Sequence, residues 1–207
     1  MGGHHHDEPT GARRTLQLAA LASRCCPSPA AALVAVGGTF RSCDDDAVDR
    51  QLDALALPLF ALGGDPERIG PALAELYSKQ FQADSRPLEG LWIDRVLAGG
   101  AGHPLVLAAI GAEIALRAGA PAVVCSSRHV WYAGLPSPDH LWLVEPACAA
   151  PGAPPCLHGH CGHELAHAAL TAIGERCARD GDAAGAVHAR ALRAMIGAGP
   201  DAHRGAE

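Results

Sequence analysis

The sequence predicts an α+β fold, in which a central helix packs on a small antiparallel sheet between N-terminal helices and a C-terminal helical hairpin. Three observations lead to this prediction. Apolar residues recur at spacings of three and four between residues 48 and 77, which is typical of helices. The apolar segment 104–117 is followed by three short runs rich in valine and tryptophan, which are typical of strands. Two further helical patterns, 162–179 and 183–196, are separated by a short Asp-Gly-Asp turn.

The first half of the chain contains several short helical patterns. Residues 1–14 are expected to form a disordered tail, and the apolar segment Leu16–Ser23 after it breaks at two prolines, Pro27 and Pro29. Three aspartates at 44–46 precede a helix that Gly63 and Gly64 end. Proline favours the first helical turn, so Pro66 opens a second helix, and a shorter one is expected near 88–97. The apolar positions of the first two patterns are Val48, Leu52, Leu55, Leu59, Leu62, Ile69, Leu73, Leu76 and Tyr77.

The central region combines the longest apolar helix with the predicted sheet. Pro104 suits the first turn of a helix that runs to Arg117, and Gly119 suits its termination. Strands are expected at 122–125, 129–132 and 141–144, with turn-like residues between them, so an antiparallel meander follows. The proline-rich segment 146–156 is expected to be a loop.

Composition excludes some classes of function. The formal net charge is −6, and acidic and basic residues are interspersed without a basic stripe, so no nucleic acid partner is expected. No run approaches 18 uninterrupted apolar residues, and no signal-peptide core is present, so we expect no membrane association and a cytoplasmic location. The eight cysteines are therefore expected to be reduced thiols, packed in the core or available as metal ligands.

Several short motifs resemble the transglutaminase-like superfamily, and its SirB-type branch in particular. A Gly-His-Pro at 102–104 opens the central helix, His-Val-Trp at 129–131 lies on the next-but-one element, and Glu-Pro follows at 145–146. Leu-Arg-Ala-Gly at 116–119 and Leu-Asp-Ala-Leu-Ala at 52–56 add to the likeness, which covers roughly 48–196. The resemblance implies a papain-like core over 15–160, followed by a helical hairpin and tail over 161–207.

In that family a cysteine at the helix N-terminus is the nucleophile, a strand histidine transfers protons and an acid orients the histidine. The corresponding positions here are Pro104, His129 and Glu145. Proline has no nucleophilic side chain and no backbone N–H, so this triad is degenerate. The resemblance thus implies a non-catalytic scaffold or regulatory protein that binds a protein or small-molecule partner. Candidate binding residues near the former cleft are His103, His129, Trp131 and Trp142. Acyl transfer or proteolysis by a displaced cysteine, Cys125, is an alternative to this non-catalytic role.

A histidine-rich segment, CLHGHCGHELAH at 156–167, supports a rival interpretation. His163, Glu164 and His167 spell HExxH, in which two histidines one helical turn apart bind zinc and the glutamate acts as general base. The third ligand of a zinc hydrolase does not follow from spacing, although Glu175 and His188 are conceivable. The alternative to a zinc hydrolase is a site that binds zinc, copper(I) or nickel without catalysis, because thiolates and imidazoles suit these ions. Its candidate ligands are Cys156, His158, His160, Cys161, His163 and His167; no other cofactor is expected.

Overall fold

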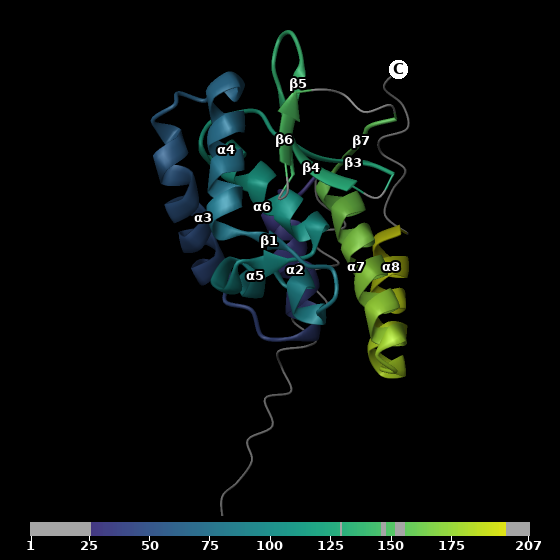
Figure 1. Cartoon of the computed structure of the whole chain (residues 1–207). Coiled ribbons are helices and arrows are strands. Elements are labelled where there is room, and N and C mark those ends of the chain that lie inside the picture. The colour runs from purple at the N-terminus through teal and green to yellow at the C-terminus, as the bar shows by residue number, and fades with distance from the viewer. Residues whose placement is uncertain (1–25, 129, 146–147, 152–155, 198–207) are drawn as a thin grey trace, which may run out of the picture.

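The computed structural model describes residues 26–128, 130–145, 148–151 and 156–197, and over these residues the fold is α+β (Figure 1). The predicted tail, the segment Leu16–Ser23 and His129 lie outside the described residues, as does Pro146. The helices are α2 (Pro29–Phe40), α3 (Asp45–Phe60), α4 (Pro66–Gln80), α5 (Ile93–Gly99), α6 (Pro104–Arg117), α7 (Gly162–Arg179) and α8 (Ala183–Gly197), with a 3₁₀ turn, η1, at Leu88–Leu91. The strands are β1 (Gln82–Ala83), β2 (Ala101–Gly102), β3 (Val123–Ser127), β4 (Val130–Pro136), β5 (Leu141–Glu145), β6 (Cys148–Pro151) and β7 (His158–His160).

Five strands form one antiparallel sheet in the order β6-β5-β4-β3-β7. The predicted meander of three strands is therefore present as β3, β4 and β5. The prediction that residues 146–156 form a loop was wrong in part, because residues 148–151 form β6. Strand β7 follows in the sequence and lies on the opposite edge of the sheet. Edge positions tolerate proline and very short strands, so neither segment shows a strong strand pattern. A separate two-stranded parallel pair, β1 and β2, lies just before α6.

Helix α6 lies at the centre of the molecule, between α3 and α4 on one side and α7 and α8 on the other (Figure 1). Every residue from Leu105 to Ala115 is buried, so the helix is covered on all its faces. One face packs on β4, where Gly111 leaves room for the hydroxyl of Tyr77 and for Ala133. The opposite side contacts α2 and α3. A central helix on a small antiparallel sheet is thus confirmed.

Sequence periodicity missed one helix, α2. It packs against α5, α6 and α7, and its less buried positions are also mostly small or apolar. The helix therefore has no amphipathic pattern. Pro29 occupies its first turn, where the missing N–H costs nothing, and Ser28 accepts a hydrogen bond from the N–H of Ala31. The proline taken as a break is therefore a helix start.

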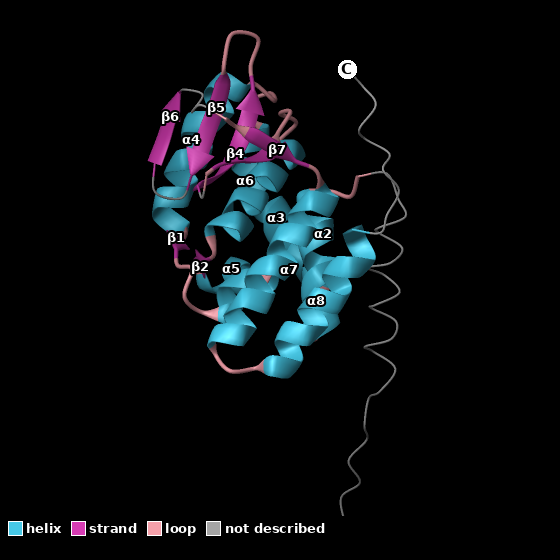
Figure 2. Cartoon of the chain, turned by 90° about the vertical axis from the view of Figure 1, so that its right-hand side faces the viewer, coloured by secondary structure: helices cyan, strands magenta, loops and turns pink. Residues whose placement is uncertain are grey.

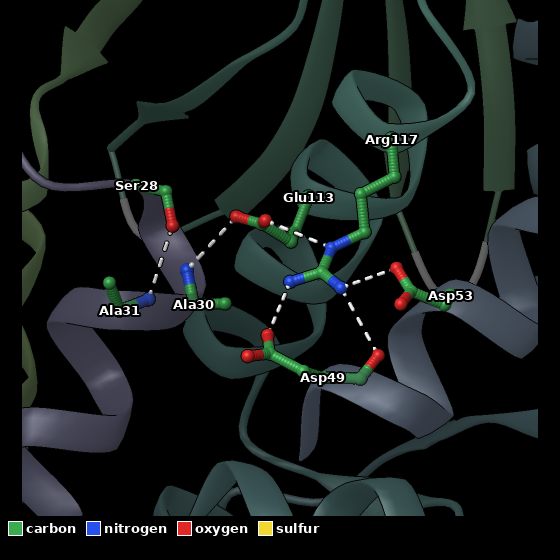
Figure 3. Close-up of polar contacts among 7 residues, drawn as sticks. All are labelled: Ser28, Ala30, Ala31, Asp49, Asp53, Glu113 and Arg117. Carbon is green, nitrogen blue, oxygen red and sulfur yellow. Dashed lines mark hydrogen bonds and ion pairs between the residues drawn. The ribbon is translucent and has the colours of Figure 1, made fainter. Parts of the chain in front are cut away.

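A charged network joins α2, α3 and α6 (Figure 3). The guanidinium of Arg117 contacts Glu113 on its own helix at 3.1 Å and Asp49 and Asp53 of α3 at 2.6 Å each. The second carboxylate oxygen of Glu113 accepts a hydrogen bond from the N–H of Ala30 at 3.3 Å. Glu113 is only 6% exposed, so this buried carboxylate depends on both partners.

The C-terminal hairpin of α7 and α8 shares the core with the rest of the chain. Leu165, Ala169 and Ile173 of α7 belong to the same buried cluster as α2 and α6. The turn at Asp180 and Gly181 joins the two helices at the end farther from the sheet (Figure 2). Among the described helices, none combines the length and the apolar character that a membrane span requires.

Candidate metal centre

The histidine-rich segment forms the junction between β7 and α7. His158 and His160 are separated by one residue on β7, and because side chains alternate along a strand, both lie on the same face. Pairing with β3 places them opposite Ser126 and Val124. The chain then turns at Cys161 and enters α7, whose first turn carries His163 and Glu164. A strand edge and a helix start therefore bring their side chains to one place.

Three of these side chains meet closely enough to share a metal ion. Candidate ligand atoms of His158, His160 and Glu164 all lie within 4.8 Å of one another. Nε2 of His158 is 3.6 Å from a carboxylate oxygen of Glu164, and the rings of His158 and His160 have centroids 4.6 Å apart. Two donors bound at about 2.0–2.1 Å to a tetrahedral ion lie roughly 3.4 Å apart, so only small side-chain rotations would complete the group. This arrangement is called the His-Glu group below.

Neighbouring residues hold His160 in position. Its Nε2 is 2.8 Å from the hydroxyl oxygen of Ser126, and its ring lies against Trp131 with centroids 4.7 Å apart. Burial, together with the neighbouring His158, lowers the pKa of His160 despite the opposing effect of Glu164. The imidazole is therefore neutral near pH 7, as a metal ligand must be, and its hydroxyl partner fixes the ring orientation.

A cavity of about 370 Å³ opens beside the His-Glu group. Its walls include His163 and His167 of α7 and the apolar side chains of Ala168 and Ile196, besides the three residues of the group. Burial, and then the charge of Arg193, lower the pKa of His167. An ion held by the His-Glu group would thus face a space large enough for a small ligand or a side chain of a partner.

The HExxH motif does not adopt its zinc-protease arrangement among the described residues. Glu164 belongs to the ligand group, and its second carboxylate oxygen accepts a hydrogen bond from the N–H of Cys161 at 2.9 Å. The Cys161 side chain in turn caps α7, so Glu164 is also the N3 residue of a capping box that begins at Cys161. The glutamate of the HExxH motif therefore has a structural role at the start of α7, which the spacing of the motif alone does not reveal.

A second group of potential ligands lies at the same helix start. Cys26, Cys161 and His163 have ligand atoms within 4.8 Å of one another. The six predicted ligands therefore do not form one cluster. Two of them, Cys161 and His163, join Cys26, which sequence reasoning missed because it comes from a segment more than 130 residues away. His167 lines only the cavity, and Cys156 is an exposed thiol in neither group.

The described positions suggested by the transglutaminase-like resemblance have separate local contacts. His103 caps α6, with Nδ1 accepting a hydrogen bond from the N–H of Leu105 at 3.2 Å. Burial, and then the charge of Arg179 in the last turn of α7, lower the pKa of His103. Trp131 instead packs against the ring of His160 in β7. Because His129 and Pro146 lie outside the described residues, the triad of Pro104, His129 and Glu145 stays a prediction.

The remaining predicted site residues have local roles in packing. The indole N–H of Trp142 donates to Glu67 at 3.0 Å, and its ring packs on Gly70 of α4, so the two tryptophans line separate contacts rather than one groove. Glu145 ends β5, and burial raises its pKa. Cys125 is buried, and burial raises its pKa to about 11, which is the opposite of an activated cysteine.

Comparisons with protein-family models, curated proteins and solved structures found no significant match to this chain.

Proposed function

We propose that this protein is a non-catalytic, cytoplasmic metal-binding protein that holds one zinc ion at the junction of β7 and α7 and uses the adjoining cavity to bind a protein or small-molecule partner. The observation that carries the proposal is the convergence of His158, His160 and Glu164 within 4.8 Å. Two imidazoles and one carboxylate suit zinc, and they leave a fourth position for water or a partner's ligand atom.

The non-catalytic part of the proposal rests on Pro104 and Cys125, neither of which can act as an activated nucleophile. Pro104 has no nucleophilic atom, and Cys125 is buried with a raised pKa. The order of elements, a buried helix followed by antiparallel strands, supports a transglutaminase-like origin for the core. The capping role of His103 and the contact of Trp131 with His160 count against a working cleft of that kind.

Calorimetric titration with zinc tests the proposal. His4, His5 and His6 are first changed to alanine, since three adjacent histidines could bind zinc on their own. We expect the double variant His158→Ala, His160→Ala to lose about one equivalent of bound zinc, because two of three ligands are gone. His140→Ala is the matched control, since His140 contacts Glu67 of α4 and belongs to neither ligand group. Equal binding by all these proteins would refute the proposal.

A second candidate function is zinc-dependent hydrolysis at the same ion. The observation that favours it is the ligand set itself, since two histidines and one glutamate with an open fourth position also occur in hydrolytic zinc centres. His167, on the cavity wall and with a lowered pKa, would then accept a proton from the zinc-bound water. Hydrolysis of an activated ester by the zinc-loaded protein that disappears in His167→Gln, with zinc binding unchanged, would favour this function over the first.

A further inference from the structure

We infer that Cys26, Cys161 and His163 form a second zinc site, distinct from the His-Glu group, that fastens the segment preceding α2 to the start of α7. The three side chains offer two sulfur atoms and one imidazole nitrogen within 4.8 Å of one another. Two thiolates with one imidazole are a donor set that zinc prefers, and a water or a partner's side chain would complete the tetrahedron.

The backbone is shaped to bring Cys26 to this place. Gly162, the first residue of α7, lies directly against Pro27, and a Cβ at Gly162 would collide with the Pro27 carbonyl oxygen. Only glycine permits this approach. Pro27 is the residue after Cys26 and Gly162 is the residue after Cys161, so the close backbone contact sets the two cysteines side by side.

The two groups of ligands differ in chemistry, so an experiment can distinguish metal binding at one from metal binding at the other. The thiol of Cys161 is half-buried and lies close to that of Cys26. Two thiols that would repel each other as thiolates are stabilised as a pair by a divalent cation, which releases their protons on binding. The His-Glu group has no sulfur ligand, so a sulfur-specific signal reports on the second site alone.

Cobalt(II) is the appropriate probe, because it takes the place of zinc and gives an intense charge-transfer absorption only when thiolates bind it. The reduced protein, with His4, His5 and His6 changed to alanine, is titrated with cobalt(II). We expect the charge-transfer band to appear, and added zinc to abolish it. Cys161→Ser should lose the band yet fold normally, because serine is a good helix cap. Cys26→Ser should lose it as well.

Two controls make the outcome specific to this geometry. Cys156→Ser removes an exposed thiol near the same segment and should leave the band unchanged. The pair His158→Ala, His160→Ala should also keep it, so that the second site can stand even if the His-Glu group binds nothing. Gly162→Ala keeps all three ligands and should weaken cobalt binding about tenfold or more, since it separates Pro27 from α7. A missing band in the reduced protein, or one that survives in Cys26→Ser, would overturn the assignment.

Discussion

Nε2 of His158 lies 3.6 Å from a carboxylate oxygen of Glu164, and this short separation joins the edge strand β7 to the first turn of α7. The other carboxylate oxygen of Glu164 accepts the hydrogen bond from Cys161 that closes the capping box. One side chain therefore serves the helix start with one oxygen and faces the two histidines with the other. The cap holds the carboxylate where a metal ion between strand and helix would need it.

These two roles of Glu164 can be separated by substitution. Glu164→Ala should lower the free energy of unfolding of the metal-free protein by about 1 kcal/mol, because the capping hydrogen bond is lost. Glu164→Gln should change it little, since the amide oxygen still accepts that bond. Both variants should bind zinc more weakly. Urea unfolding in the presence of a chelator, beside zinc titration, measures the two effects. Unchanged zinc binding in Glu164→Gln would exclude the carboxylate as a ligand.

Substitution of Arg117 is expected to lower the stability of the fold, because this side chain pairs with three carboxylates. Arg117→Met would leave the buried carboxylate of Glu113 without its cation and should destabilise the fold by about 2–4 kcal/mol. Lys79→Met, which removes an exposed pair with Glu75, should leave the stability nearly unchanged. Adding Glu113→Gln to Arg117→Met should recover part of the loss, because the neutral amide still accepts the N–H of Ala30. No recovery in urea unfolding would show that packing, rather than charge, dominates.

The His103 cap predicts a pH dependence of stability. The folded pKa of His103 is lowered, so the unfolded chain binds the proton more tightly. The stabilising contribution is therefore complete above the unfolded pKa of about 6.5 and is lost as the pH falls through the lower folded pKa. Protonated Nδ1 can no longer accept the N–H of Leu105, and a positive charge at a helix N-terminus is unfavourable.

His103→Asn tests this dependence, since asparagine caps helices without titrating. The loss of unfolding free energy between about pH 7.5 and pH 5 should be smaller in the variant than in the parent protein. A residual slope is expected from His160 and His167, whose pKa values are also lowered. Identical slopes in the two proteins would contradict a titrating cap.

Thiol reactivity distinguishes a buried Cys125 from a displaced nucleophile. With a pKa of about 11, Cys125 would be thiolate in roughly one molecule in a thousand at pH 8, and its side chain is buried as well. Alkylation of the native, metal-free protein should therefore modify the exposed Cys156 well before Cys125. Peptide mass spectrometry after a short reaction measures the order. Rapid, selective labelling of Cys125 would revive the cysteine-enzyme alternative.

Sequence patterns predicted most of the helices and the three central strands, because Pro66, Pro104 and Gly119 mark element boundaries that depend on backbone conformation alone. Helix α2 was missed because its less buried positions are also mostly small or apolar, which leaves no periodicity. Strands β6 and β7 were missed because edge strands need few β-forming residues. In the candidate site, the histidine segment itself was recognised. Its division into two groups was not, since Cys26 reaches it only through the contact between Pro27 and Gly162.

Elemental analysis tests the central claim most directly. The protein, with His4, His5 and His6 changed to alanine, is exposed to zinc, freed of excess metal by gel filtration, and compared with the same protein carrying His158→Ala and His160→Ala. The account predicts that the double variant retains about one zinc ion per chain fewer than its parent. Equal zinc contents in the two proteins would contradict a metal site at the junction of β7 and α7.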